Sequence, residues 1–207
     1  MCLSNLELFS DINSHLLRAL RANTKLLFAE NAIQALTYLS EPDLVGVIIG
    51  DEGVTKRSNS NVTARLVHYV EQGGAVVVAG LFPTFSNGDD FNRLFKHGFQ
   101  LPWERGSYLR TTFHKNTQND IVKSNPSLSA SYSMKALHVK KITPESALYK
   151  ADESSFTQSA VFPPTAITDF EESPAVSVQF GRGTISYLGD VNAEESSTKT
   201  VLAMLGL

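Results

Sequence analysis

Residues 1–80 alternate between two hydrophobic patterns, one typical of helices and one of buried strands. Apolar positions at three- and four-residue steps predict helices over 6–22, 31–39 and 61–72, and short apolar runs predict strands over 24–29, 45–49 and 75–80. Val45–Ile49 is almost continuously β-branched without polar alternation, as in parallel strands covered on both faces. The succession predicts a three-layer α/β sandwich, with a mainly parallel sheet between two layers of helices.

Capping residues place the ends of several predicted helices. Ser4 and Glu7 have the spacing of a capping box at the start of the first helix, and Gly73 with Gly74 provides a left-handed stop for the third. Ile33, Leu36 and Leu39 are predicted to share the buried face of the second helix. Near the end of the chain, Asn192 and Glu195 predict a capped final helix that runs to Leu205 and stops at Gly206.

The pattern becomes irregular over residues 82–165. We expect a short helix over 87–95, a polar surface segment over 117–133, and short strands over 107–115, 137–142, 147–150 and 159–162. Residues 175–180 and 184–188 then predict a hairpin that turns at Gly181-Arg182-Gly183. The expected organisation is one domain over 1–207 with an irregular excursion at about 82–165.

Composition narrows the function classes. The chain carries 18 Lys and Arg against 21 Asp and Glu, a formal net charge of −3, so no basic field favours nucleic acid. Cys2 is the single cysteine, which excludes an intrachain disulfide and a cysteine-rich zinc site. The sequence has neither a signal-peptide pattern nor a membrane-length apolar run, so we expect a cytoplasmic protein without a membrane partner.

Two glycine-containing segments resemble a known superfamily. The segments are Gly73-Gly74-Ala75-Val76-Val77-Val78-Ala79-Gly80 and Phe180-Gly181-Arg182-Gly183-Thr184-Ile185-Ser186-Tyr187-Leu188-Gly189-Asp190. Together they are similar to the class I glutamine amidotransferase-like superfamily, and especially to its ThuA-like branch. The resemblance covers about 24–207 and implies a flavodoxin-like fold.

The resemblance also argues against the activity of that superfamily. Its catalytic members carry a nucleophilic cysteine on the turn after the central strand, and a histidine and a carboxylate after the last strand. Here that turn reads Gly80-Leu81-Phe82-Pro83-Thr84, and the last strand is followed by Gly189-Asp190-Val191-Asn192. Leu81 and Phe82 have no nucleophilic atom, so we expect no glutaminase or amidotransferase activity, and the chain is predicted to be a pseudoenzyme.

Ligands of open parallel sheets bind beyond the carboxyl ends of the strands, which makes the residues there candidates for a crevice. The residues expected to line it are Glu30, Asp51, Glu52, Leu81, Phe82, His114, Asp190 and Asn192. Asp51, Glu52 and Asp190 are the candidate catalytic residues, because carboxylates hold hard cations or bind sugar hydroxyls. The alternative is that the three side chains cap local structure. No cofactor is expected, because no phosphate-binding glycine loop opens a helix, and the five histidines lack a metal-binding spacing.

Aromatic residues are dense between the predicted central strand and residue 103. They are Phe82, Phe85, Phe91, Phe95, Phe99 and Trp103. The cluster is interpreted as the core of a subdomain, with an apolar pocket, a partner-binding face or a homodimer interface as alternatives.

Two hypotheses for function follow from the sequence. The first is a non-catalytic module that binds a small molecule or a protein partner. The second is an enzyme in which carboxylates, alone or with a metal, act on a carbohydrate-like small molecule, which requires Asp51, Glu52 and Asp190 to converge.

Overall fold

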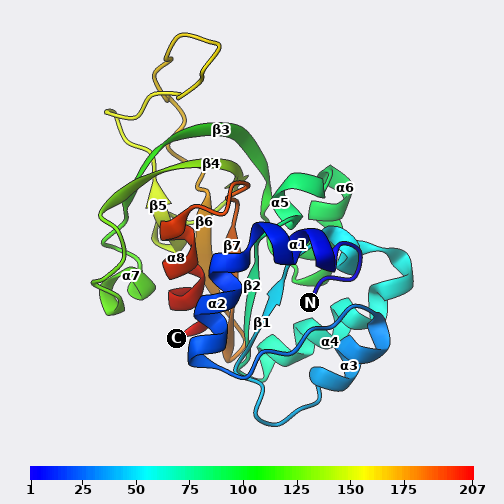
Figure 1. Ribbon diagram of the computed structural model, residues 1–207. Coiled ribbons are helices and arrows are strands. Elements are labelled where there is room, and N and C mark those ends of the chain that lie inside the picture. The colour runs from blue at the N-terminus through cyan, green and yellow to red at the C-terminus, as the bar shows by residue number, and fades with distance from the viewer.

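The computed structural model describes residues 1–207 as an α/β fold around an open, mixed, seven-stranded sheet (Figure 1). The strand order is β1-β2-β7-β6-β5-β3-β4, and the bounds are β1 Gly46–Ile49, β2 Ala75–Val78, β3 Glu104–Lys115, β4 Ser131–Lys140, β5 Ala147–Lys150, β6 Ala175–Phe180 and β7 Gly183–Leu188. Only β1, β2 and β7 are parallel, and all other pairings are antiparallel. The sheet is therefore less parallel than the sequence predicts. No helix is long and apolar enough to cross a membrane.

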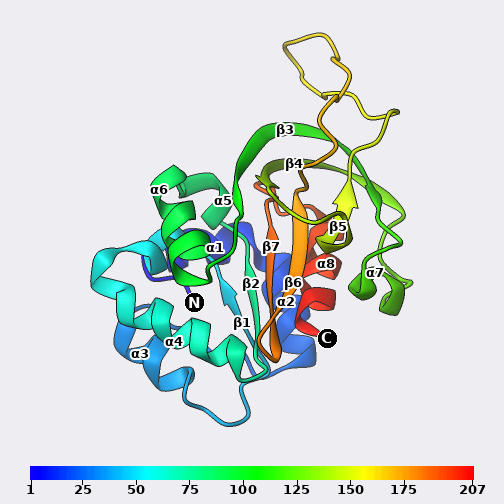
Figure 2. The same ribbon diagram turned by 180° about the vertical axis from the view of Figure 1, so that it is seen from behind.

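Helices cover both faces of the parallel half. The helices α1 Leu6–Ile12, α2 Ser14–Asn23 and α8 Glu195–Leu205 contribute to one apolar core, and α3 Ala32–Tyr38 and α4 Ser60–Glu71 contribute to the other. In Figure 1 the helices α2 and α8 face the viewer, and in Figure 2, the view from the opposite side, α3 and α4 do. Val77 and Val78 point into opposite cores, as alternation along a doubly covered strand requires.

The N-terminal region differs from its sequence pattern in several ways. The predicted helix over 6–22 is broken at Asn13, whose side chain donates to the carbonyl of Phe9, so α1 and α2 are separate helices. The predicted capping box is wrong, because Asn5 precedes α1 and makes no side-chain cap. Residues 24–29 form no strand: the Thr24 N–H closes the last turn of α2, and the carbonyl of Ala29, which accepts the Cys2 N–H, makes the one backbone hydrogen bond to another segment. Ile33 is 79% exposed, so its predicted burial is wrong too.

The predicted helix over 61–72 and its glycine stop are confirmed. The helix α4 buries Val62, Leu66 and Val70, and Gly73 follows it with φ +114°. Two 3-10 turns, η1 Glu52–Thr55 and η2 Arg57–Asn59, connect β1 to α4.

The aromatic cluster lies in the core. The short helices α5 Phe82–Phe85 and α6 Gly88–Phe91 and the π-helix η3 Asn92–Gly98 carry most of it. Phe82, Phe91, Phe95, Phe99 and Trp103 are at most 2% exposed, and only Phe85 of the group reaches the surface. The cluster therefore cannot form an exposed partner face. Its interpretation as core packing is confirmed, but the expected separate subdomain is wrong, because these side chains share one core with β2, β7 and α4.

Residues 104–150 form a long curved hairpin, and the expectation of an irregular excursion is wrong here. The strands β3 and β4 bend together into an arch over the sheet (Figure 1), and β5 joins β3 to β6. A bulge interrupts the β3–β4 pairing between Arg105 and Tyr108. The expected polar surface segment contains helix α7 Asp120–Ser124 and the start of β4, and it buries Val122 and Leu128.

Residues 151–174 form a projecting arm, which rises from the body near β5 in both views (Figures 1 and 2). The two sides of the arm form an isolated β-bridge at Phe156 and Ala166, with hydrogen bonds from the Thr157 N–H to the Thr165 carbonyl and from the Ile167 N–H to the Ser155 carbonyl. The predicted strand over 159–162 is wrong, because these residues form the exposed tip of the arm, where Val161 is 80% and Phe162 72% exposed.

The C-terminal hairpin is confirmed, with Gly181 at φ +60° in the turn between β6 and β7. The strand β7 then lies between β2 and β6, where the parallel part of the sheet meets the antiparallel part. The final helix α8 stops at Gly206 in the left-handed conformation as predicted, but Asn192 does not cap it, because Glu194 occupies the cap position.

Candidate functional site

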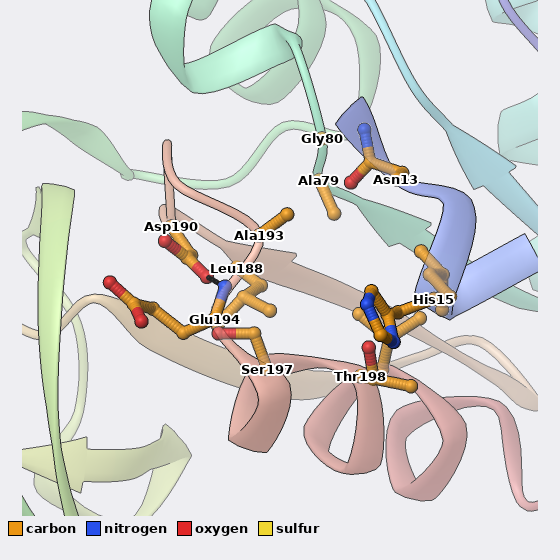
Figure 3. Close-up of a pocket in the computed structure, with 12 residues that line it drawn as sticks. Asn13, His15, Ala79, Gly80, Leu188, Asp190, Ala193, Glu194, Ser197 and Thr198 are labelled. Atoms are coloured by element: carbon orange, nitrogen blue, oxygen red, sulfur yellow. Dashed lines mark hydrogen bonds between the residues drawn. The ribbon is translucent and has the colours of Figure 1, made fainter. Parts of the chain in front are cut away.

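The carboxyl ends of β1, β2 and β7 meet at one edge of the sheet, where the sequence predicts a crevice. Gly50, Gly80 and Gly189 follow these three strands. The N-termini of α2 and α8 approach the same edge, and Figure 3 shows the side chains that face the space between them.

Asp51 holds the N-terminal segment onto this edge. Its side chain is almost completely buried, and its two oxygens accept four backbone hydrogen bonds, from Leu3 (3.0 Å), Ser4 (2.8 Å), Asn5 (2.8 Å) and Gly53 (3.0 Å). The donors from Ser4 and Asn5 come from the turn that leads into α1, where an anion near a helix N-terminus is stabilising. Asp51 is therefore an anchor, and each of its carboxylate oxygens accepts two hydrogen bonds from backbone N–H groups.

The N-terminal segment in turn fills the space beyond β1 and β2. The ring of Phe9 packs directly against Gly50 and Gly80, and a Cβ at either glycine would overlap it. Gly80 also has a φ of +69°, in the left-handed region that glycine adopts more readily than other residues. A side chain from α1 thus occupies the place where an open parallel sheet would hold a ligand.

The turn after β2 offers no nucleophile. Leu81 and Phe82, both expected in the crevice, are at most 3% exposed and lie in the two cores. The Leu81 N–H donates to the carbonyl of Gly50 (2.8 Å), which leaves it unable to stabilise an oxyanion. Burial raises the pKa of the Cys2 thiol to about 12, so the single cysteine is unreactive as well.

Asp190 is a local cap. It is 5% exposed and accepts the N–H groups of Asn192 (2.9 Å) and Glu194 (2.7 Å) at the entrance to α8. Burial raises the pKa of this carboxyl above its usual range, although these hydrogen bonds oppose the shift. Asn192 contributes its backbone, and the expected side-chain cap is absent.

The remaining crevice candidates lie apart from this point. Glu30 is exposed at the start of α3, where its N–H donates to the side chain of Gln34. Glu52 begins η1, and its Oε2 is buried without a hydrogen-bond partner. His114 lies near the far end of β3, with Nε2 3.5 Å from Asp152 of the arm. No group of three or more His, Cys, Asp or Glu side chains is placed to hold a metal ion.

The cavity left between α2 and α8 is about 20 Å³, room for roughly one water molecule. Sequence reasoning missed its polar lining residues, Asn13, His15, Glu194, Ser197 and Thr198. They belong to the first turns of two helices, where periodicity places His15 on the solvent side. These residues could have been considered, because the N-termini of helices commonly face the carboxyl edge of a parallel sheet.

A buried ionisable pair that the sequence did not predict lies behind the arch. His138 Nδ1 is 2.9 Å from Glu172 Oε1, and both side chains are at most 4% exposed. Oε2 of Glu172 accepts the N–H of Ser107, which the β3 bulge frees from the ladder (3.0 Å). Burial alone would raise the pKa of Glu172, but these hydrogen bonds outweigh it and lower the pKa to about 2. His138 Nε2 has no partner and its ring packs edge-on to Phe113, so the pair is structural.

A larger concavity lies between the arch and the arm. This groove has a volume of about 500 Å³, and Arg110, Thr112, Ser154, Phe156, Gln158 and Pro164 are among the residues that line it. Arg110 and Thr112 lie on β3, and the others belong to the arm. None of the sequence candidates lines it.

No family model matches the chain, and no curated protein matches it. Among solved structures it is similar to the β-galactosidase from Bacillus circulans sp. alkalophilus, with a TM-score of 0.42 and 12% identity over 78% of this chain and 21% of that chain. It is also similar to Gan42B, a GH42 β-galactosidase, with a TM-score of 0.37 and 17% identity over 79% of this chain and 21% of that one. The chain spans about one fifth of the length of each.

Proposed function

We propose that this protein is a non-catalytic binding domain, a relative of the class I glutamine amidotransferase-like fold whose ligand site is the groove between the arch and the arm. One observation carries the proposal. The edge of the sheet that would hold a substrate is filled by Phe9 and retains about 20 Å³, whereas the groove offers about 500 Å³. Small-molecule sites usually measure about 300–1,000 Å³.

The chemistry of the sheet edge supports the same proposal. A catalytic carboxylate must be free to take up or release a proton, or to hold a cation, within reach of a substrate. Both oxygens of Asp51 are committed to backbone N–H groups, and so are those of Asp190. The rival hypothesis of a carboxylate-dependent enzyme therefore has less support than the binding domain.

A thermal-shift panel of sugars, amino acids including glutamine, nucleotides and divalent cations tests the proposal, because a ligand of the folded state raises the unfolding midpoint. Thr112→Val alters the groove, and Thr198→Val is the matched change beside the small cavity. We expect a ligand whose shift disappears in Thr112→Val and persists in Thr198→Val. The reverse pattern, no shift with any compound, or turnover of glutamine or another panel compound would each contradict the proposal.

The tip of the arm favours a second candidate function, binding of a protein partner. Val161 and Phe162 expose most of their side chains next to Pro163 and Pro164, and exposed apolar clusters mark interaction surfaces. If a second copy of the chain covers the tip, sedimentation velocity will show a dimer at tens of micromolar protein, and Phe162→Ser will return it to a monomer. A monomer at every concentration would exclude self-association through the tip.

A further inference from the structure

We infer that the groove between the arch and the arm binds a neutral, hydroxyl-rich ring, that is, a sugar or a cyclic polyol. The inference rests on the proposed binding function and names its ligand class. Three features of the lining carry it: a rigid hydrogen-bonding floor, a compensated charge and a half-exposed aromatic ring.

The floor of the groove is held by side-chain hydrogen bonds that link the arch to the arm. Arg110 donates to Ser133 Oγ (3.1 Å), Ser133 donates to Gln158 Oε1 (2.6 Å), and Gln158 Nε2 donates to Thr112 Oγ1 (2.9 Å). The Gln158 N–H also donates to the carbonyl of Arg110 (2.8 Å). The planar groups of Arg110 and Gln158 are therefore fixed before a ligand arrives, which reduces the entropy lost on binding.

The charge of the groove disfavours an anionic ligand. Arg110 is the only basic residue in its lining, and its guanidinium lies 2.7 Å from the carboxylate of Glu194. The arm itself contains five acidic residues and no Lys or Arg. They are Asp152, Glu153, Asp169, Glu171 and Glu172, of which Asp152 faces His114 and Glu172 is buried against His138, and none of them lines the groove. A phosphate or carboxylate would therefore meet a cation that Glu194 already compensates, whereas a neutral, hydroxyl-bearing ligand brings no charge for the groove to balance.

Phe156 supplies an apolar surface beside these polar groups. Its side chain is 49% exposed and lines the groove together with Pro164 and the hydroxyl-bearing Thr112 and Ser154. A sugar ring presents C–H groups on its faces and hydroxyls around its edge, so it needs an aromatic face next to planar hydrogen-bonding side chains. The groove places both within one volume of about 500 Å³.

Titration calorimetry with the full chain tests the ligand class. The probes are D-glucose, D-galactose, maltose and myo-inositol, with gluconate, glucose 6-phosphate and triglycine as charged and peptide comparators. Phe156→Ala removes the ring from the groove, Phe156→Tyr restores it, and Phe162→Ala is the matched control on the same arm, outside the groove. We expect one or more neutral probes to bind with a Kd that rises about tenfold in Phe156→Ala and stays within about twofold in the other two variants.

The outcomes separate the ligand class from the proposed function. Binding that prefers a charged or peptide comparator, and that Phe156→Ala weakens, keeps the groove as a ligand site and overturns the hydroxyl-rich ligand. Equal loss of affinity in Phe156→Ala and Phe162→Ala also overturns the inference, because contact with the ring in the groove would not be responsible. A failure of every compound in the thermal-shift panel would remove the binding function together with this inference.

Discussion

Asp51→Ala will lower the free energy of unfolding by about 4 kcal/mol, because four backbone N–H groups, one buried and three partly buried, lose a carboxylate acceptor at once. In a chain of this length such a loss lowers the thermal midpoint by about 10 °C. Urea denaturation and calorimetry measure the two quantities. The N-terminal segment should also exchange its amide hydrogens earlier than the rest of the protein, since three of the four donors belong to it.

Glu52→Gln is the matched control for the Asp51 variant. The two carboxylates are neighbours in sequence, but Glu52 Oε2 is buried without a partner, so removal of its charge breaks no hydrogen bond at that atom. We expect a change within about 1 kcal/mol. If Asp51→Ala does not fold, Asp51→Asn replaces it, because the asparagine keeps one acceptor oxygen. We expect the loss of stability in Asp51→Asn to exceed that in Glu52→Gln. Equal effects of Asp51→Ala and Glu52→Gln would contradict the anchoring role.

Glu172→Gln will destabilise the protein by about 3 kcal/mol at neutral pH, because it replaces a buried carboxylate that accepts hydrogen bonds from two groups. The Gln amide has one acceptor oxygen where the carboxylate has two, so it cannot accept in the same way at both the Ser107 N–H and the His138 ring. Unfolding in urea at pH 7 measures the loss. Glu171→Gln, on the exposed neighbour, is the control and should be close to neutral.

The same pair predicts how stability depends on acid. The folded pKa of Glu172 is about 2, below its ordinary value of 4.5, so the folded state binds the proton less readily than the unfolded state. The contribution of Glu172 is therefore complete above about pH 4.5 and is lost as the pH falls toward 2. The difference in stability between the wild type and Glu172→Gln should shrink over that interval. A difference that stays constant down to pH 2 would show that the carboxylate does not carry the effect.

The parallel half of the fold could be predicted because its signals are local. Val45–Ile49 and Ala75–Val78 are uninterrupted apolar runs. A strand that is covered on both faces needs such a run whichever strands it pairs with, so the run alone predicts the strand. The strands of the arch were predicted only in part: 107–115 matches most of β3 and 137–142 overlaps the end of β4, but the start of β4 was taken as a polar surface segment. Ser131–Ser133 has no strand pattern of its own, and it is held by pairing with residues 112–114.

The sequence predicted that Asp51 and Asp190 lie at the carboxyl edge of the parallel strands, but it did not predict what these side chains do there. Asp51 and Asp190 do follow parallel strands and do lie at the predicted edge. The role of Asp51 depends on donors from residues 3–5, and that of Glu172 depends on a bulge near residue 106, both distant in sequence. A single sequence carries no sign of which distant backbone will present its N–H groups. The groove was missed for the same reason, since β3 and the arm meet only in three dimensions.

The position of β7 between β2 and β6 determines when the sheet can be completed during translation. The strand β2 finds its second neighbour only when residues 184–187 pair with residues 75–78, and β6, which pairs with β5 on its other side, also lacks its second neighbour until β7 emerges. A nascent chain that stops short of this strand has two unpaired strand edges, which invite association with other chains. The sheet is therefore completed only after β7 has been synthesised, and the pairing that joins its two halves links residues far apart in sequence, the kind of contact that slows folding.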